Sequence, residues 1–160
     1  MQSYQARLIQ ESFAPLSPDL AKRIADAYIA GPKQGDAGMD LRYLGETVRL
    51  EPGATVTAGT GLAVWIRDPN YVGLCYPRSG LGSKSGIVLA NLTGVIDSNY
   101  QGEIKVVLWN RSQTSVVIEQ GERVCQLVIQ PIVQHKAEWV DAFDDTTDRG
   151  EQGFGHSGKH

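Results

Sequence analysis

The sequence has few cysteines, no long hydrophobic run and no excess of positive charge. Its two cysteines, Cys75 and Cys125, lack a CxxC-type spacing, and the first residues lack the basic region and apolar core of a secretory signal. We therefore expect reduced thiols and a cytoplasmic location. No apolar run approaches the ~20 residues of a membrane helix, so we expect no membrane association. A formal net charge of -3 argues against nucleic acid as a partner, although a local basic cluster could still bind a small anion.

What is present is the composition of one ordinary domain with a single core, 160 residues long, 41% hydrophobic and 21% charged. One helix is predicted over residues 18–30, because Ser17 is a suitable N-cap, Pro18 suits the first helical position and Gly31 ends the pattern. The face predicted to be buried carries Leu20, Ile24, Ala27 and Tyr28.

After Gly38 the sequence consists of short runs rich in Val, Ile, Thr and aromatic residues, separated by Gly, Pro, Asn and Asp. This pattern predicts an all-β barrel or sandwich, and the lack of alternating helices disfavours a parallel α/β fold. Beyond residue 140 the sequence becomes acidic and then glycine-rich, which is typical of a mobile arm. The predicted strand runs are "TVRL", "TVTAGTGLAVWI", "YVGLCY", "GIVLAN", "GEIKVVLWN", "SVVIE", "RVCQLVIQPIV" and "AEWV".

The segment "YPRSGLGSKSG", residues 76–86, combines an arginine, several hydroxyls and glycines that expose backbone N–H groups. These are the donors that bind a phosphate. The alternative is a polar hairpin loop in which the charge is incidental, since Gly/Ser loops with one arginine are common.

The segment "NLTGVIDSNYQGE", residues 91–103, predicts a β-hairpin that holds a carboxylate at its edge. Asp97 follows the apolar pair Val95-Ile96, and a carboxylate placed there can orient and deprotonate a water. Tyr100 offers a flat, rigid surface for a sugar or a base. Alternatively, Asp97 and Asn99 simply form the turn, as Asx residues often do.

Two further segments carry charged residues next to apolar ones. Asp40 stands between apolar neighbours in "DAGMDLRY", so we expect a charge or hydrogen-bond partner for it, most simply a structural ion pair. In "GERVCQLVI" Arg123 and Gln126 flank an apolar pair, and taken alone they indicate only a solvated strand end.

Taken together, "AGMDL", "PRSGLGSKSG", "GVIDSNYQG", "GERVCQ" and "RGEQGFGHSG" resemble, in order, the five motifs of the trimeric dUTPase family (dUTP pyrophosphatases). The resemblance covers about residues 37–158 and leaves the helix at 18–30 as an insertion. It implies a β-barrel of jelly-roll type and a homotrimer whose active sites lie between subunits. It also implies Mg²⁺-assisted hydrolysis of dUTP to dUMP and pyrophosphate, which limits dUTP and supplies dUMP for thymidylate synthesis.

The resemblance assigns roles to individual residues. Asp97 would hold and activate the attacking water, and Tyr100 would stack on the deoxyribose and exclude a 2′-hydroxyl. Arg123 would be a buried ion-pair partner, and Asp40 would support the site or act in the outer shell of a magnesium ion held by the phosphates. The predicted uracil contacts come from Asn91, Gly94, Val95 and Ile96, and the predicted phosphate contacts from Arg78, Ser79, Gly80 and Gln126.

The resemblance also divides the chain into a barrel, residues 1–147, and a glycine-rich lid, residues 148–160. In the lid Arg149 and Ser157 would grip the γ-phosphate, the Gly155 backbone would cradle it and Phe154 would cover the uracil. Because such a segment buries little apolar surface, we expect it to order only over the full triphosphate.

Two other functions remain open. A dCTP deaminase, or a bifunctional enzyme on the same barrel, needs a glutamate at the base, and none of Glu103, Glu119 and Glu122 lies in a matching motif. A regulatory binding module could instead use the extra helix to dock a partner protein.

Overall fold

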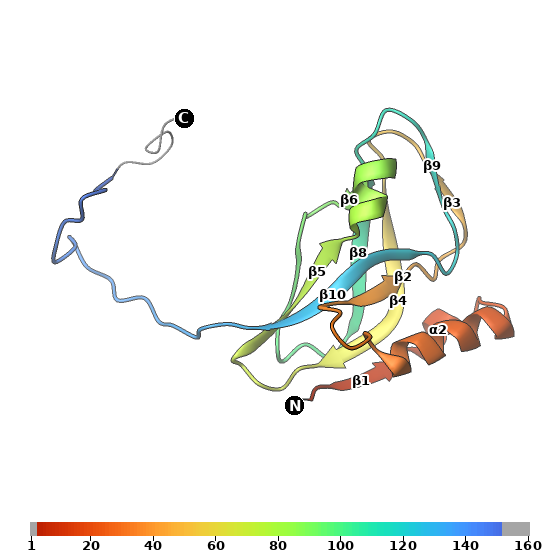
Figure 1. The fold of residues 1–160 in the computed structure, drawn as a ribbon, viewed down its shortest axis with the longest axis horizontal. Coiled ribbons are helices and arrows are strands. Elements are labelled where there is room, and N and C mark those ends of the chain that lie inside the picture. The colour runs from red at the N-terminus through yellow and green to blue at the C-terminus, as the bar shows by residue number, and fades with distance from the viewer. Residues whose placement is uncertain (1–2, 152–160) are drawn as a thin grey trace.

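The computed structural model describes residues 3–151 of the chain. Within these residues the chain forms ten strands, two α-helices and one short π-helical turn, and most of the strands wrap into a barrel-like body (Figure 1). The elements are β1 (Gln5–Leu8), α1 (Gln10–Phe13), α2 (Pro18–Ala30), β2 (Met39–Arg42), β3 (Val48–Leu50), β4 (Thr55–Trp65), β5 (Tyr71–Pro77), η1 (Leu81–Ser85), β6 (Ile87–Leu89), β7 (Gly94–Ile96), β8 (Glu103–Asn110), β9 (Val116–Ile118) and β10 (Arg123–Pro131).

Every strand pair is antiparallel. The strand orders are β1-β4-β8-β6 and β2-β10-β5-β7 in two four-stranded sheets, and β3 pairs with β9 in a small third sheet. Strand β8 shows the alternation of a half-buried strand, because Ile104, Val106 and Leu108 point inward while the residues between them do not. Both large sheets contribute to one apolar core, which confirms the predicted all-β fold.

Helix α2 begins and ends where the sequence predicts, at Pro18 and Ala30. Its N-cap is also confirmed, since the Ser17 side chain accepts a hydrogen bond from the Leu20 amide at 3.3 Å. The predicted buried face is wrong at one position. The face centres on Ile24 and Tyr28 and takes in Ala21 and Ala25, which turns Ala27 toward solvent.

Both ends of the chain differ from the expectation. Strand β1, which the sequence pattern does not predict, pairs with β4 from Gln5↔Trp65 to Leu8↔Leu62. The strand predicted for "AEWV" is wrong, because residues 132–151 contain neither helix nor strand. Aromatic and β-branched composition favours a strand only where a neighbouring edge is available, and Trp139 is 93% exposed.

Residues 132–151 leave the barrel after β10 and extend away from it (Figure 1). The division into a barrel ending at 147 and a lid from 148 remains a prediction. In the part of the chain that the structure describes, no helix is long and apolar enough to cross a membrane.

Candidate active site

Asp40, Arg78 and Arg123 form an ion-pair group, called here the arginine cluster. Arg78 Nε lies 3.0 Å from Asp40 Oδ1, and Arg123 Nη1 lies 3.0 Å from Asp40 Oδ2. The strand order explains the meeting, because β10 lies between β2 and β5, with Gln126 opposite Asp40. The ion pair predicted for Asp40 is therefore confirmed.

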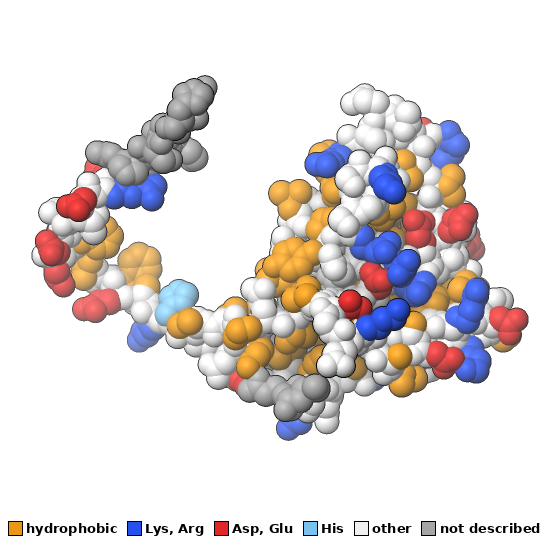
Figure 2. Space-filling view, viewed as in Figure 1, with side chains coloured by type: hydrophobic (Ala, Val, Ile, Leu, Met, Phe, Trp, Pro, Cys, Tyr) orange, Lys and Arg blue, Asp and Glu red, His pale blue; other side chains and the backbone are white. Residues whose placement is uncertain are grey.

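The arginine cluster lies at the surface of the barrel. The Asp40 side chain is 35% exposed and that of Arg123 is 49% exposed, so Arg123 is an ion-pair partner as predicted but is not buried. Figure 2 shows basic side chains gathered around acidic ones on the face over β10 and β2. Because one carboxylate orients two guanidinium groups, this surface can present fixed donors to an anion.

The other predicted phosphate contacts lie next to this cluster. Gln126 Nε2 donates to the Pro77 carbonyl at 3.4 Å, which links β10 to the residue before Arg78. Ser79 and Gly80 are exposed at the start of the turn that continues into η1, and the Ser83 hydroxyl donates to the Ser79 carbonyl at 2.5 Å. Short π-helical turns of this kind occur often at functional sites.

Asp97 and Tyr100 line a cavity of about 290 Å³, called here the Asp97 pocket. The turn between them is closed by the backbone, since the Tyr100 amide donates to the Asp97 carbonyl at 3.1 Å. The carboxylate of Asp97 is thus not needed for this turn hydrogen bond, and Asp97 is exposed. The residues that line the pocket are Val95, Ile96, Asp97, Tyr100, Glu103, Ile104 and Lys105, so Arg78, Ser79 and Gln126 are not among them.

The segment before Asp97 passes from one sheet to the other. Strand β7 pairs with β5, as in Leu74↔Val95, whereas β6 pairs with β8. The hairpin prediction is therefore wrong in its pairing, because β7 and β8, the strands on either side of the turn after Asp97, lie in different sheets. A second cavity of about 400 Å³ adjoins the Asp97 pocket, since both include Ile96 and Lys105, and Asn91 and Gly94 contribute to its wall.

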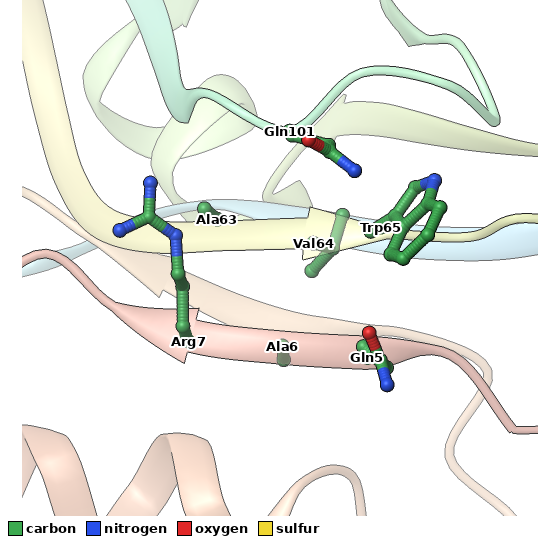
Figure 3. Close-up of a pocket in the computed structure, with 7 residues that line it drawn as sticks. All are labelled: Gln5, Ala6, Arg7, Ala63, Val64, Trp65 and Gln101. Carbon is green, nitrogen blue, oxygen red and sulfur yellow. The ribbon is translucent and has the colours of Figure 1, made fainter.

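A larger hollow of about 570 Å³ lies over β1 and β4 (Figure 3). Arg7, Trp65 and Gln101 surround it, and the Arg67 guanidinium lies 5.3 Å from the Trp65 ring centroid. None of the residues that line this hollow was predicted as a site residue. The candidate site is therefore taken to be the arginine cluster and the Asp97 pocket, where predicted site residues are found.

Sequence reasoning missed the position of Glu103, whose side chain is only 12% exposed and lines the Asp97 pocket. Its Oε1 accepts hydrogen bonds from Ser12 Oγ and the Gly61 amide, both at 2.8 Å, and its Oε2 lies 3.7 Å from Lys105 Nζ. The Glu103 carboxylate is thus held in place by two hydrogen bonds and one longer ion pair. This arrangement does not suit the proton-shuttle glutamate of a deaminase.

Both cysteines are free and fully buried, in agreement with the expected reduced thiols. A hydrogen bond with Cys75, together with burial, raises the pKa of the Cys125 thiol. Cys125 therefore stays protonated near neutral pH and behaves as a core residue.

The residues suit a magnesium ion carried by phosphate better than one held by the protein alone. Over residues 3–151 no three His, Cys, Asp or Glu side chains are placed to hold a metal, and both Asp40 oxygens already accept from arginines. Mg²⁺ typically takes one or two carboxylates plus substrate phosphates.

In the C-terminal segment, Arg149 is exposed, whereas Phe154, Gly155 and Ser157 lie outside the described residues.

The family profile described as dUTPase matches residues 27–158. The deoxyuridine 5'-triphosphate nucleotidohydrolase of Idiomarina loihiensis is 57% identical over 127 residues, which cover 79% of this chain and 83% of that protein. The enzyme of the same name from Acinetobacter baumannii is 55% identical over 126 residues, covering 78% and 83%.

Solved structures agree with the sequence match. The dUTPase of Staphylococcus bacteriophage 80alpha with dUPNHPP has a TM-score of 0.78 and 30% identity, with 99% of each chain covered. A mutant dUTPase of S. aureus phage phi11, described for the coordination of a structural Mg(II) ion, has a TM-score of 0.68 and 27% identity, covering 89% of this chain and 99% of that one. With five ordered motifs, an all-β fold and these similarities, the chain belongs to the dUTPase family.

Proposed function

We propose that the chain hydrolyses dUTP to dUMP and pyrophosphate, and so limits dUTP while supplying dUMP for thymidylate synthesis. The observation that carries the proposal is the Asp97 pocket, which combines an exposed carboxylate and a stacking ring in a chain of the dUTPase family. Asp97 acts as the general base: it takes a proton from a water whose oxygen attacks the α-phosphorus. The bond to the bridging oxygen then breaks, and pyrophosphate leaves.

Tyr100 forms the platform for the deoxyribose. Its hydroxyl donates to the Glu103 carbonyl at 2.8 Å, which fixes the ring against the start of β8. A ring fixed at this position lies against the sugar and leaves no space for a 2′-hydroxyl, so UTP is rejected. The uracil is read next to it by Asn91 and by backbone groups of Gly94, Val95 and Ile96.

The phosphate chain is bound by Arg78, Ser79, Gly80 and Gln126. Arg78 contributes a guanidinium that Asp40 already orients, so little rearrangement is needed as charge develops on the leaving group. A magnesium ion held by the phosphates would supply further neutralisation of their charge, and Asp40 would support it from the outer shell. Asp40 acts chiefly by holding the two arginines.

The active site is shared between chains of a homotrimer. This part of the proposal is supported by the separation seen in one chain, where the residues that line the Asp97 pocket do not include Arg78, Ser79 or Gln126. Residues 148–160 close over the bound triphosphate: Arg149 and Ser157 hold the γ-phosphate, the Gly155 backbone cradles it and Phe154 covers the base.

The test is pyrophosphate release from dUTP, dCTP, dTTP, UTP and dUDP with Mg²⁺, with ammonia release from dCTP measured in parallel. We expect turnover of dUTP alone, because the sugar platform and the base contacts reject the other nucleotides and dUDP lacks the γ-phosphate. Equal turnover of UTP would remove Tyr100 from its proposed role. Ammonia from dCTP would establish a deaminase instead, and no reaction at all would leave a binding module.

A further inference from the structure

The N-terminal segment lies largely outside the region matched to the dUTPase family, which begins at residue 27. It nevertheless packs against the barrel near the candidate site: β1 pairs with β4, the neighbour of β8, and α2 contacts β2 through a hydrogen bond between Tyr28 and Arg42 (Figure 1). Two hydroxyl groups of this segment, on Ser12 and Tyr28, reach into the barrel and make hydrogen bonds there.

Tyr28 connects α2 to the strand of the arginine cluster. Its hydroxyl donates to the Thr60 carbonyl at 2.8 Å and accepts from the Arg42 amide at 2.9 Å, and the residue is only 7% exposed. Arg42 lies two residues after Asp40 in β2. Burial raises the pKa of the Tyr28 hydroxyl, in keeping with a neutral group that donates and accepts at once.

The same helix also supports the approach to Arg123. The Arg42 side chain donates through Nη1 to the Gly121 carbonyl at 2.9 Å. Leu20 of α2 packs on Gly121 so closely that a Cβ there would lie 2.8 Å from Leu20 Cδ1. The strands that carry Asp40 and Arg123 are thus both in contact with α2, β2 through Arg42 and β10 through Gly121 at its approach.

Ser12 makes the second connection, which leads to the Asp97 pocket. Its hydroxyl donates to Glu103 Oε1 at 2.8 Å, an atom that also accepts from the Gly61 amide. The carbonyl of the same Glu103 accepts from the Tyr100 hydroxyl at 2.8 Å. Ser12 therefore holds the side chain of Glu103, and the backbone carbonyl of Glu103 in turn anchors the Tyr100 ring.

We infer that Tyr28 and Ser12 are positioning residues of the dUTP site: Tyr28 holds the arginine cluster for the phosphates, and Ser12 holds the Tyr100 platform for the sugar. The inference rests on the proposed function. Loss of the Tyr28 hydroxyl removes a hydrogen bond from both the Thr60 carbonyl and the Arg42 amide, and loss of the Ser12 hydroxyl removes one of the two hydrogen bonds to Glu103 Oε1, so that the strand or the side chain can shift. The two losses thus affect different parts of the nucleotide.

The experiment measures binding of inorganic pyrophosphate and of deoxyuridine by calorimetry, together with dUTP turnover, in the full chain with Mg²⁺. Tyr28→Phe is expected to weaken pyrophosphate binding by roughly five- to tenfold and to leave deoxyuridine binding within about twofold. Ser12→Ala is expected to do the reverse. In both variants we expect the KM for dUTP to change, whereas the ranking of the nucleotides as substrates should stay the same.

Tyr43→Phe is the matched control. Tyr43 is also a buried residue, and its hydroxyl donates to a backbone carbonyl, that of Glu46 at 2.9 Å, but this partner lies only three residues away in the chain. We expect a comparable loss of thermal stability and no change in either ligand. Should Tyr28→Phe fail to fold, Arg42→Met removes the bond to the Gly121 carbonyl and is expected to weaken pyrophosphate alone.

The outcomes separate this inference from the proposed function. If the wild-type chain turns over dUTP but Tyr28→Phe and Ser12→Ala change both ligands equally, or neither, the positioning roles are wrong and the function stands. A wild-type chain that binds neither ligand and releases no pyrophosphate overturns both.

Discussion

The arginine cluster and the Asp97 pocket belong to one chain, yet their side chains are held by intrachain contacts to different degrees. In the cluster, one carboxylate joins two guanidinium groups from neighbouring segments at 3.0 Å each. In the pocket, Asp97 is exposed and Tyr100 is 42% exposed, although the ring is anchored through its hydroxyl. The proposed phosphate-binding half is thus held by ion pairs within the chain, whereas in the proposed catalytic half Asp97 is exposed.

This difference determines how much each half must still be ordered when the substrate binds. The arginines are oriented before an anion arrives, so binding does not have to order them, and preoriented charges stabilise a transition state best. Asp97 carries no comparable restraint on its carboxylate in the turn, whose hydrogen bond is made by the backbone. Its orientation is expected to come from the substrate, the water and a neighbouring chain.

The largest effect is expected from Asp97→Asn. The change removes the proposed base, so turnover of dUTP should fall by at least ~10². Because Asp97 is exposed, the free energy of unfolding should change by no more than about 0.5 kcal/mol, and dUTP binding should persist. Steady-state kinetics and calorimetry measure both. Unchanged turnover would remove Asp97 from its role.

Arg78→Ala tests the preassembled half. It removes one charge-assisted contact to phosphate, worth about 1.5–3 kcal/mol, so the KM for dUTP should rise roughly ten- to hundredfold. Arg49→Ala is the matched control, since Arg49 of β3 forms an exposed ion pair with Glu51. A KM that rises equally in the control would mean that general surface charge, rather than the arginine cluster, attracts the nucleotide.

Truncation before Asp148 separates closure from folding. We expect turnover to fall by roughly tenfold or more, because at least one charge-assisted phosphate contact is lost with Arg149. The melting temperature should not change, since residues 148–151 are exposed and add no strand to the barrel. A lower melting temperature together with loss of the oligomer would show that the segment is structural.

The smallest effect concerns alkaline pH. Burial raises the pKa of Tyr28 above its value of 10 in the unfolded chain, so the neutral hydroxyl contributes stability that is fully present below pH 10 and is lost as pH rises toward the folded pKa. Tyr28→Phe should therefore lose less stability than the wild type above pH 10. Chemical denaturation at pH 8 and pH 10.5 measures the difference, and parallel losses would contradict it.

The sequence predicts local features well. Ser17, Pro18 and Gly31 define α2 because capping depends on neighbouring residues, and most strands lie where β-branched runs stand between turn residues. The ion pair of Asp40 follows from a charge placed among apolar neighbours. Asp97 and Tyr100 lie in one pocket because only two residues separate them.

Features that depend on distant pairing could not be predicted. Strand β1 is a strand because β4 offers an edge, and "AEWV" is not one because it has no neighbouring strand. The anchoring of Glu103 by Ser12 joins residues 91 positions apart. The partition of the site into two surfaces follows from sheet order, which composition and spacing do not fix.

The most direct test of the account is complementation between two impaired variants. Asp97→Asn and Arg78→Ala chains are mixed, unfolded and refolded together, and dUTP turnover is measured well below the wild-type KM, where each variant alone is slow, on oligomers shown by mass spectrometry to contain both. If each site takes Asp97 from one chain and Arg78 from another, a random one-to-one mixture of trimers should recover about a quarter of the wild-type rate. No recovery in confirmed mixed oligomers would place both residues in a site formed by one chain, and would contradict the account.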